Sequence, residues 1–105
     1  MNLMRIEQLL KFLEEDPNDV FARYALALEY QKSDPEKAEE VFDHVFTLNP
    51  DYLPAYYMAA MLKVELGKPE EAFRLLTKGV ELARQCNNHS TLRELQEALQ
   101  LLEPE

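Results

Sequence analysis

The sequence predicts an all-α protein of about six helices, and two observations favour this fold class. Leu, Ala and Glu are abundant while β-branched residues are few, and Gly occurs only twice in 105 residues, a composition that favours helix over strand. Apolar residues also recur three and four positions apart between breaking residues. The length and the 47% hydrophobic content predict one globular domain, residues 1–105.

Breaking residues divide the chain into its predicted helices. Pro17 ends the first, the pair Asp34-Pro35 opens the third as an N-cap followed by proline, and Gly67 stops the fourth. Thr91-x-x-Glu94 has the form of a capping box, which predicts the start of the last helix at residue 90 or 91. The expected helical stretches are 3–15, 19–32, 34–48, 53–66, 68–85 and 90–102.

Landmark residues recur at a period of 33 or 34 residues, which indicates an internal repeat. The matched pairs are Tyr24 with Tyr57, Ala27 with Ala60, Pro35 with Pro69, Ala38 with Ala72, and Phe42 with Leu76. The offset changes by one residue in the turn before Pro35, which is one residue shorter than its counterpart before Pro69. Two helix pairs, residues 19–50 and 53–85, therefore form the predicted repeats.

These residues resemble the tetratricopeptide repeat, whose pattern is W-x2-L-G-x2-Y, then A-x3-F, then P. The first repeat reads Arg23-x2-Leu26-Ala27-x2-Tyr30, Ala38-x3-Phe42 and Pro50; the second reads Tyr56-x2-Ala59-Ala60-x2-Lys63 and Ala72-x3-Leu76. Arg23, Lys63 and Arg84 depart from the family's Trp, Tyr and Pro.

The resemblance implies a right-handed solenoid of antiparallel helix pairs. It implies that residues 3–15 are half a repeat and that residues 90–102 cap the stack. The chain is also similar to small stand-alone bacterial proteins of this family.

The two inner helices, 19–32 and 53–66, are apolar nearly all the way round, which predicts burial on one side and a second apolar face. By the family's geometry that face lines a concave groove that takes a peptide or a segment of a partner protein. The predicted groove residues are Phe21, Tyr24, Leu28, Gln31, Tyr57, Met58, Met61 and Val64.

Two alternatives remain open for this face. The first and last helices of so short a stack could cover it, in which case its tyrosines belong to the core. A second copy of the chain could instead bury it, giving a structural homodimer with no separate ligand. The matching positions lack the Lys, Asn and Arg with which family members clasp acidic chaperone tails, so that mode of binding is not expected.

Composition and spacing argue against several other functions. A formal charge of −9 leaves no basic face for nucleic acid and disfavours anionic membranes. Neighbouring acids such as Glu70 and Glu71 point in different directions on a helix, and no Cys or His has ligand spacing. We therefore expect no enzyme activity, no cofactor, no metal and no membrane partner. The single cysteine favours the cytoplasm.

Three side chains carry smaller expectations. Lys32 and Lys63, near the ends of the inner helices, are predicted to be solvated surface residues. Cys86 follows an apolar helix, which predicts a partly buried thiol at the helix end rather than a nucleophile.

Overall fold

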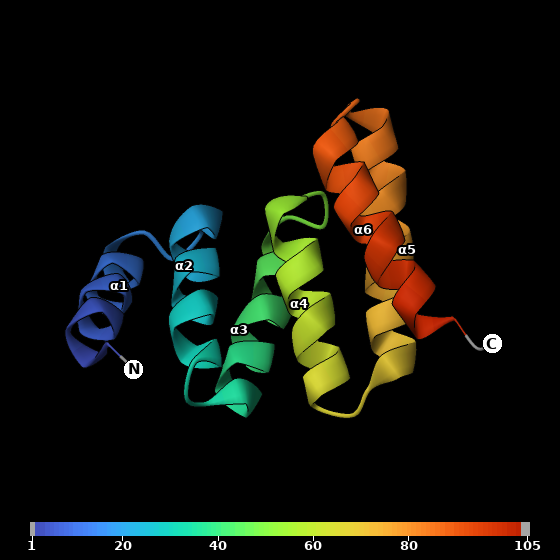
Figure 1. Ribbon diagram of the computed structural model, residues 1–105. Coiled ribbons are helices and arrows are strands. Elements are labelled where there is room, and N and C mark those ends of the chain that lie inside the picture. Colours follow the sequence, from blue (N-terminus) through green and yellow to red (C-terminus); the bar gives the residue numbers. More distant parts are fainter. Residues whose placement is uncertain (1, 104–105) are drawn as a thin grey trace. The chain divides into compact units, whose positions relative to one another are not determined.

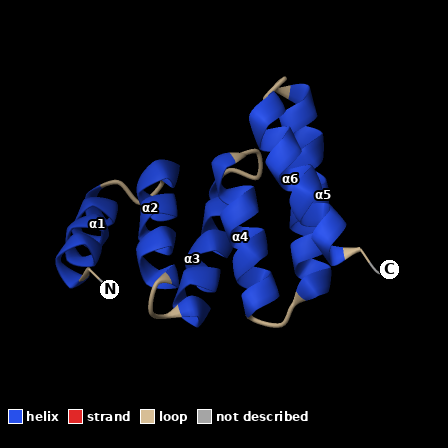
Figure 2. Cartoon of the chain, viewed as in Figure 1, coloured by secondary structure: helices blue, strands red, loops and turns tan. Residues whose placement is uncertain are grey.

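The computed structural model describes residues 2–103, and these residues form helices joined by turns (Figures 1 and 2). The helices are α1 (Leu3–Glu15), α2 (Val20–Gln31), α3 (Pro35–Leu48), α4 (Pro54–Glu65), α5 (Pro69–Gln85) and α6 (His89–Leu102). The predicted all-α fold with six helices is confirmed over this part of the chain.

Short polar side chains begin four of the helices. Asn2, Asp19, Asp34 and Asn88 each accept a hydrogen bond from the backbone N–H three residues later, at distances from 2.8 to 3.2 Å. Each bond satisfies a donor that the first helical turn leaves unpaired. The capping box predicted at Thr91 is wrong, because Thr91 lies inside the first turn and donates its own N–H to Asn88.

The ends of α4 and α5 share one geometry. Gly67, with φ of 76°, and Asn87, with φ of 57°, both adopt the left-handed conformation directly after the helix cap. The next residue then donates its N–H back into the last helical turn, Lys68 to the Lys63 carbonyl at 2.8 Å and Asn88 to the Ala83 carbonyl at 2.9 Å. These bonds form Schellman motifs, which end both helices where the sequence predicts.

The chain divides into two compact units, Met1–Tyr52 and Leu53–Glu105. The first contains α1, α2 and α3, and the second contains α4, α5 and α6. The division falls in the loop between the two predicted repeats.

In the first unit, α2 packs against both α1 and α3. The side chains of Ala27 and Ala38 are fully buried, so α2 and α3 can approach closely, and Phe42 fills the space beside them. Glu29 of α2, also buried, links α2 to α1, because its carboxylate lies 3.0 Å from the Arg5 guanidinium. The Lys32 ammonium at the end of α2 lies 3.3 Å from the same carboxylate.

In the second unit, α5 packs between α4 and α6. A β-carbon added at Gly79 would lie 3.0 Å from Leu95 of α6 and 3.1 Å from the β-carbon of Tyr56 on α4. The glycine therefore lets three helices meet at one level, which offsets the about 1 kcal/mol that glycine costs inside a helix relative to alanine.

Candidate functional site

The predicted groove residues of α2 differ in how far they are exposed. Phe21 is 70% exposed, whereas Tyr24, Leu28 and Gln31 are partly buried. The Tyr24 ring lies 6.3 Å from the Phe42 ring and 5.6 Å from the Tyr52 ring. Tyr24 thus contributes to the packing of the first unit while keeping part of its surface accessible.

The predicted groove residues of α4 are all at least partly accessible. Tyr57, Met58 and Met61 are partly buried, and Val64 is 40% exposed. Residues 57, 61 and 64 follow the spacing that places side chains on one helical face. The buried residues of the helix lie at other positions: Ala55, Tyr56, Ala59, Ala60, Leu62 and Lys63.

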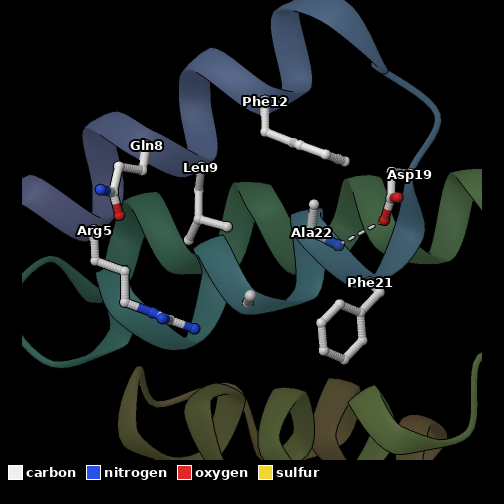
Figure 3. Close-up of a pocket in the computed structure, with 8 residues that line it drawn as sticks. Arg5, Gln8, Leu9, Phe12, Asp19, Phe21 and Ala22 are labelled. Carbon is white, nitrogen blue, oxygen red and sulfur yellow. Dashed lines mark hydrogen bonds between the residues drawn. The ribbon is translucent and has the colours of Figure 1, made fainter.

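An apolar cleft of about 330 Å³ opens beside Phe21, between α1 and α2 (Figure 3). Leu9 and Phe12 of α1 extend toward Ala22 of α2, and Phe21 also lines the cleft from α2. The complete lining is Arg5, Gln8, Leu9, Phe12, Asp19, Phe21, Ala22 and Ala25. Buried alanines provide small methyl groups inside the cleft, and two exposed phenyl rings flank it.

The charged groups at the cleft already have partners. Asp19 accepts the Ala22 N–H at 2.8 Å, which Figure 3 marks with a dashed line, and Arg5 pairs with Glu29 at 3.0 Å. The pKa of the Tyr52 phenol is raised above its usual 10.0, mainly by burial and to a smaller extent by the negative charge of Asp19. The cleft is therefore suited to contact apolar side chains.

Phe12 is a cleft residue that the sequence reasoning missed, although a signal for it existed. In the repeat register Phe12 matches Val45, which is fully buried, yet Phe12 is 47% exposed. α1 is the predicted half-repeat, and within residues 2–103 no helix precedes it that could cover this position. An aromatic residue at a core position of an incomplete repeat could therefore have been predicted to be accessible.

Two residue-level expectations are wrong. Lys63 is only 6% exposed, and its ammonium lies 3.0 Å from a carboxylate oxygen of Glu71 on α5; the predicted solvated lysine is a buried ion-pair partner instead. The thiol of Cys86 is exposed rather than partly buried, because the residue lies at the cap where α5 has already ended. Lys32, as expected, is exposed, and it pairs with Glu29.

Over the described residues, no three His, Cys, Asp or Glu side chains gather as metal ligands would. A membrane crossing would need a longer and more apolar helix than any found in residues 2–103.

Two of the solved structures similar to this chain are of tetratricopeptide repeat domain proteins. A solution structure of a tetratricopeptide repeat domain protein from Salinibacter ruber is 35% identical, covers 83% of this chain and 89% of its own, and superposes with a TM-score of 0.77. A crystal structure of a tetratricopeptide repeat domain protein from Salinibacter ruber is 34% identical. It covers 80% of this chain and 94% of its own, and superposes with a TM-score of 0.74.

MamA shares the fold at 18% identity, with a TM-score of 0.68 over 92% of this chain and 64% of MamA. No curated protein matches the chain. The family model described as tetratricopeptide repeat matches residues 29–99, well over half of the sequence. The helix pairs, their landmark residues and these matches agree: the chain belongs to the tetratricopeptide repeat family.

Proposed function

We propose that this protein binds a peptide or a segment of a partner protein through the apolar faces of α2 and α4. A tetratricopeptide repeat domain is in general a protein-interaction module, and stacked helical repeats use such faces for binding. The observation that carries the proposal is Phe21, an aromatic side chain 70% exposed beside an open apolar cleft.

The chemistry of both faces supports this role. An exposed phenyl ring loses unfavourable contact with water when a partner covers it, and aromatic anchors dominate the free energy of many interfaces. Tyr57 combines apolar area with a polar hydroxyl, and Met58 and Met61 adapt their flexible thioethers to different shapes. The partner would contribute apolar side chains to the cleft and to the face of α4.

The proposal is tested by the double variant Tyr57→Glu, Met61→Glu. Two carboxylates on the α4 face would have to be desolvated when a partner binds, so capture from the native cell extract should fall about tenfold or more. The matched control is Phe73→Glu, Thr77→Glu, which adds the same charge at the same spacing on exposed positions of α5. Circular dichroism should show unchanged helicity for both variants.

Two results would contradict the proposal. Equal capture by the wild type and both variants would show that the α4 face is not used. Loss of helicity in the Tyr57→Glu, Met61→Glu variant alone would show that this face belongs to the core. The homodimer alternative is decided separately by light scattering after size exclusion: a mass of 12.3 kDa at high concentration excludes it, whereas twice that mass supports it.

A further inference from the structure

A second cavity, of about 270 Å³, lies within the first unit on a different side of α2. Its apolar part comes from all three helices: Leu10 of α1, Leu26 of α2 and Val41 of α3. Leu26 and Val41 are buried and form the interior, whereas Leu10 is partly exposed at the rim. At 100° per residue, these α2 positions lie well away from Tyr24 and Leu28, so this cavity is distinct from the face proposed above.

Polar residues lie at both ends of this cavity. Because α2 and α3 are antiparallel and joined by a short turn (Figure 1), Arg23 lies at the same end as His44, and Tyr30 at the same end as Lys37. Arg23 and Tyr30 are seven residues apart on α2, and Lys37 and His44 are seven residues apart on α3. The two ends of the cavity are therefore about 10 Å apart.

The Arg23 end offers one buried hydrogen-bond donor that has no partner among the described residues. One terminal nitrogen of the guanidinium donates to the Pro17 carbonyl at 2.7 Å. The Nε of Arg23 is buried and has no hydrogen-bond partner among the described residues. A buried donor of a charged group that is left unpaired is costly, and a carboxylate is the acceptor that a guanidinium binds most strongly.

The charge balance of this cavity is opposite to that of the chain. Overall, 20 acidic residues outnumber the 11 Lys and Arg residues, but the cavity lining contains two cationic side chains, Arg23 and Lys37, against a single carboxylate, Glu40. Glu40 lies 3.6 Å from the Lys37 ammonium, which partly neutralises that end. The Arg23 end therefore carries the positive charge that has no anionic side chain beside it in the lining.

We propose that this cavity binds an acidic segment of a partner protein in which a carboxylate side chain adjoins a large apolar one. The carboxylate accepts hydrogen bonds from Arg23 and His44, and the apolar side chain packs against Leu26 and Val41 beneath Leu10. The cavity is smaller than the about 300–1,000 Å³ that holds drug-sized ligands, which suits two side chains of a longer chain. The site is independent of the α2 and α4 faces.

The test uses a synthetic peptide, Ser-Gly-Glu-Leu-Gly-Ser with blocked termini, titrated into the isotopically labelled protein and followed by NMR. We expect saturable shifts of the amide signals of residues lining the cavity. A peptide with Gln in place of Glu should bind about tenfold more weakly, because it loses the charge-assisted hydrogen bonds. A peptide with Ala in place of Leu should also bind more weakly.

Protein variants place the site. Arg23→Gln should weaken peptide binding about tenfold. This change also affects the hydrogen bond from Arg23 to the Pro17 carbonyl. Variants of the exposed residue His44 and the rim residue Leu10 leave that hydrogen bond intact. His44→Ser and Leu10→Ser should each weaken binding about threefold. The matched control His89→Ser, an exposed histidine of α6, and the Tyr57→Glu, Met61→Glu variant should bind the peptide like the wild type.

Three results would overturn the proposal: no saturable binding of the Glu-Leu peptide, equal affinity for the Gln-Leu peptide, or wild-type affinity in both His44→Ser and Leu10→Ser. Loss of binding in the Tyr57→Glu, Met61→Glu variant would place the peptide on α4 and likewise contradict it.

Discussion

Lys63 brings a charged ammonium into the interior of the second unit, where Glu71 pairs with it from the next helix. Taking an ammonium out of water is costly unless a carboxylate compensates it. Glu71 itself remains partly exposed, so water screens part of the attraction. The pair therefore fixes α4 against α5 at one level without giving the full free energy of a buried ion pair.

We predict that Glu71→Ala lowers the free energy of unfolding by about 1–3 kcal/mol, because it leaves the buried Lys63 ammonium with less compensation. The matched control is Glu70→Ala, which removes the same charge from the same first turn of α5 but from an exposed side chain. Guanidinium denaturation of both variants measures the difference. Equal losses would mean that only the helix dipole, and not the contact with Lys63, is affected.

Tyr52 gives a prediction about pH. Its pKa is raised above 10.0 by burial and by Asp19, so the folded protein holds the phenol proton to higher pH than the unfolded chain does. The contribution of the protonated Tyr52 phenol to the free energy of unfolding is complete below pH 10, and it is lost as the pH rises through the folded-state pKa of Tyr52. The difference in unfolding free energy between wild type and Tyr52→Phe should therefore fall as the pH rises above 10.

Urea denaturation at several pH values between 8 and about 11 checks this. In an Asp19→Asn background, which keeps an N-cap side chain but removes the charge, the fall should be smaller. A difference between wild type and Tyr52→Phe that stays constant across this range would contradict the account.

The sequence could not place these single side chains, and the reason is physical. Lys63 stands where the family has tyrosine. The repeat pattern does not state that the neighbouring helix places a carboxylate, that of Glu71, beside this position. The thiol of Cys86 is exposed although α5 ends at Gln85 as predicted, because an apolar helix does not determine on which side its cap residue lies. Burial at one residue depends on contacts that helical spacing alone does not specify.

At the scale of the helix, termini are determined by short-range chemistry, and most of them could be predicted. Asp34 and Gly67 act where the sequence predicts, because caps and left-handed turns depend on a few adjacent residues. The start of α6 was misassigned because two capping signals, Asn88 and Thr91, lie three residues apart. Asn88 acts as the cap, and its side chain then occupies the N–H of Thr91.

Gly79 gives a prediction at this scale. Helix propensity alone predicts that Gly79→Ala stabilises α5 by about 1 kcal/mol. The added methyl group would meet Leu95 at 3.0 Å and the Tyr56 β-carbon at 3.1 Å, and overpacking typically costs about 1–3 kcal/mol. We therefore expect a net loss of about 1 kcal/mol in thermal or chemical denaturation.

The double variant Gly79→Ala, Leu95→Ala provides the control. Truncating Leu95 should cost less in the Gly79→Ala background than in the wild type, because the methyl group occupies part of the space that the leucine leaves. A gain in stability for Gly79→Ala alone would contradict the close packing of α4, α5 and α6.

At the scale of the whole chain, the fold was predictable because repeat proteins are stabilised mainly by contacts between neighbouring helices. Landmarks such as Ala27 and Ala60 in matching register were enough to identify the helix pairs. The binding surface was less predictable. Phe12 shows why: it matches the fully buried Val45 in the repeat register and yet is 47% exposed, so the register alone does not state which positions are accessible.

Site-specific photo-crosslinking tests the central claim, that the α2 and α4 faces bind a separate protein, most directly. Benzoylphenylalanine replaces Phe21 or Met61 in turn, and Phe73, an exposed aromatic of α5, serves as the control position. Irradiation in native cell extract should give adducts of one common mass from positions 21 and 61 and none from position 73. No adduct from positions 21 and 61, or only an adduct of two copies of the 12.3 kDa chain, would contradict the claim.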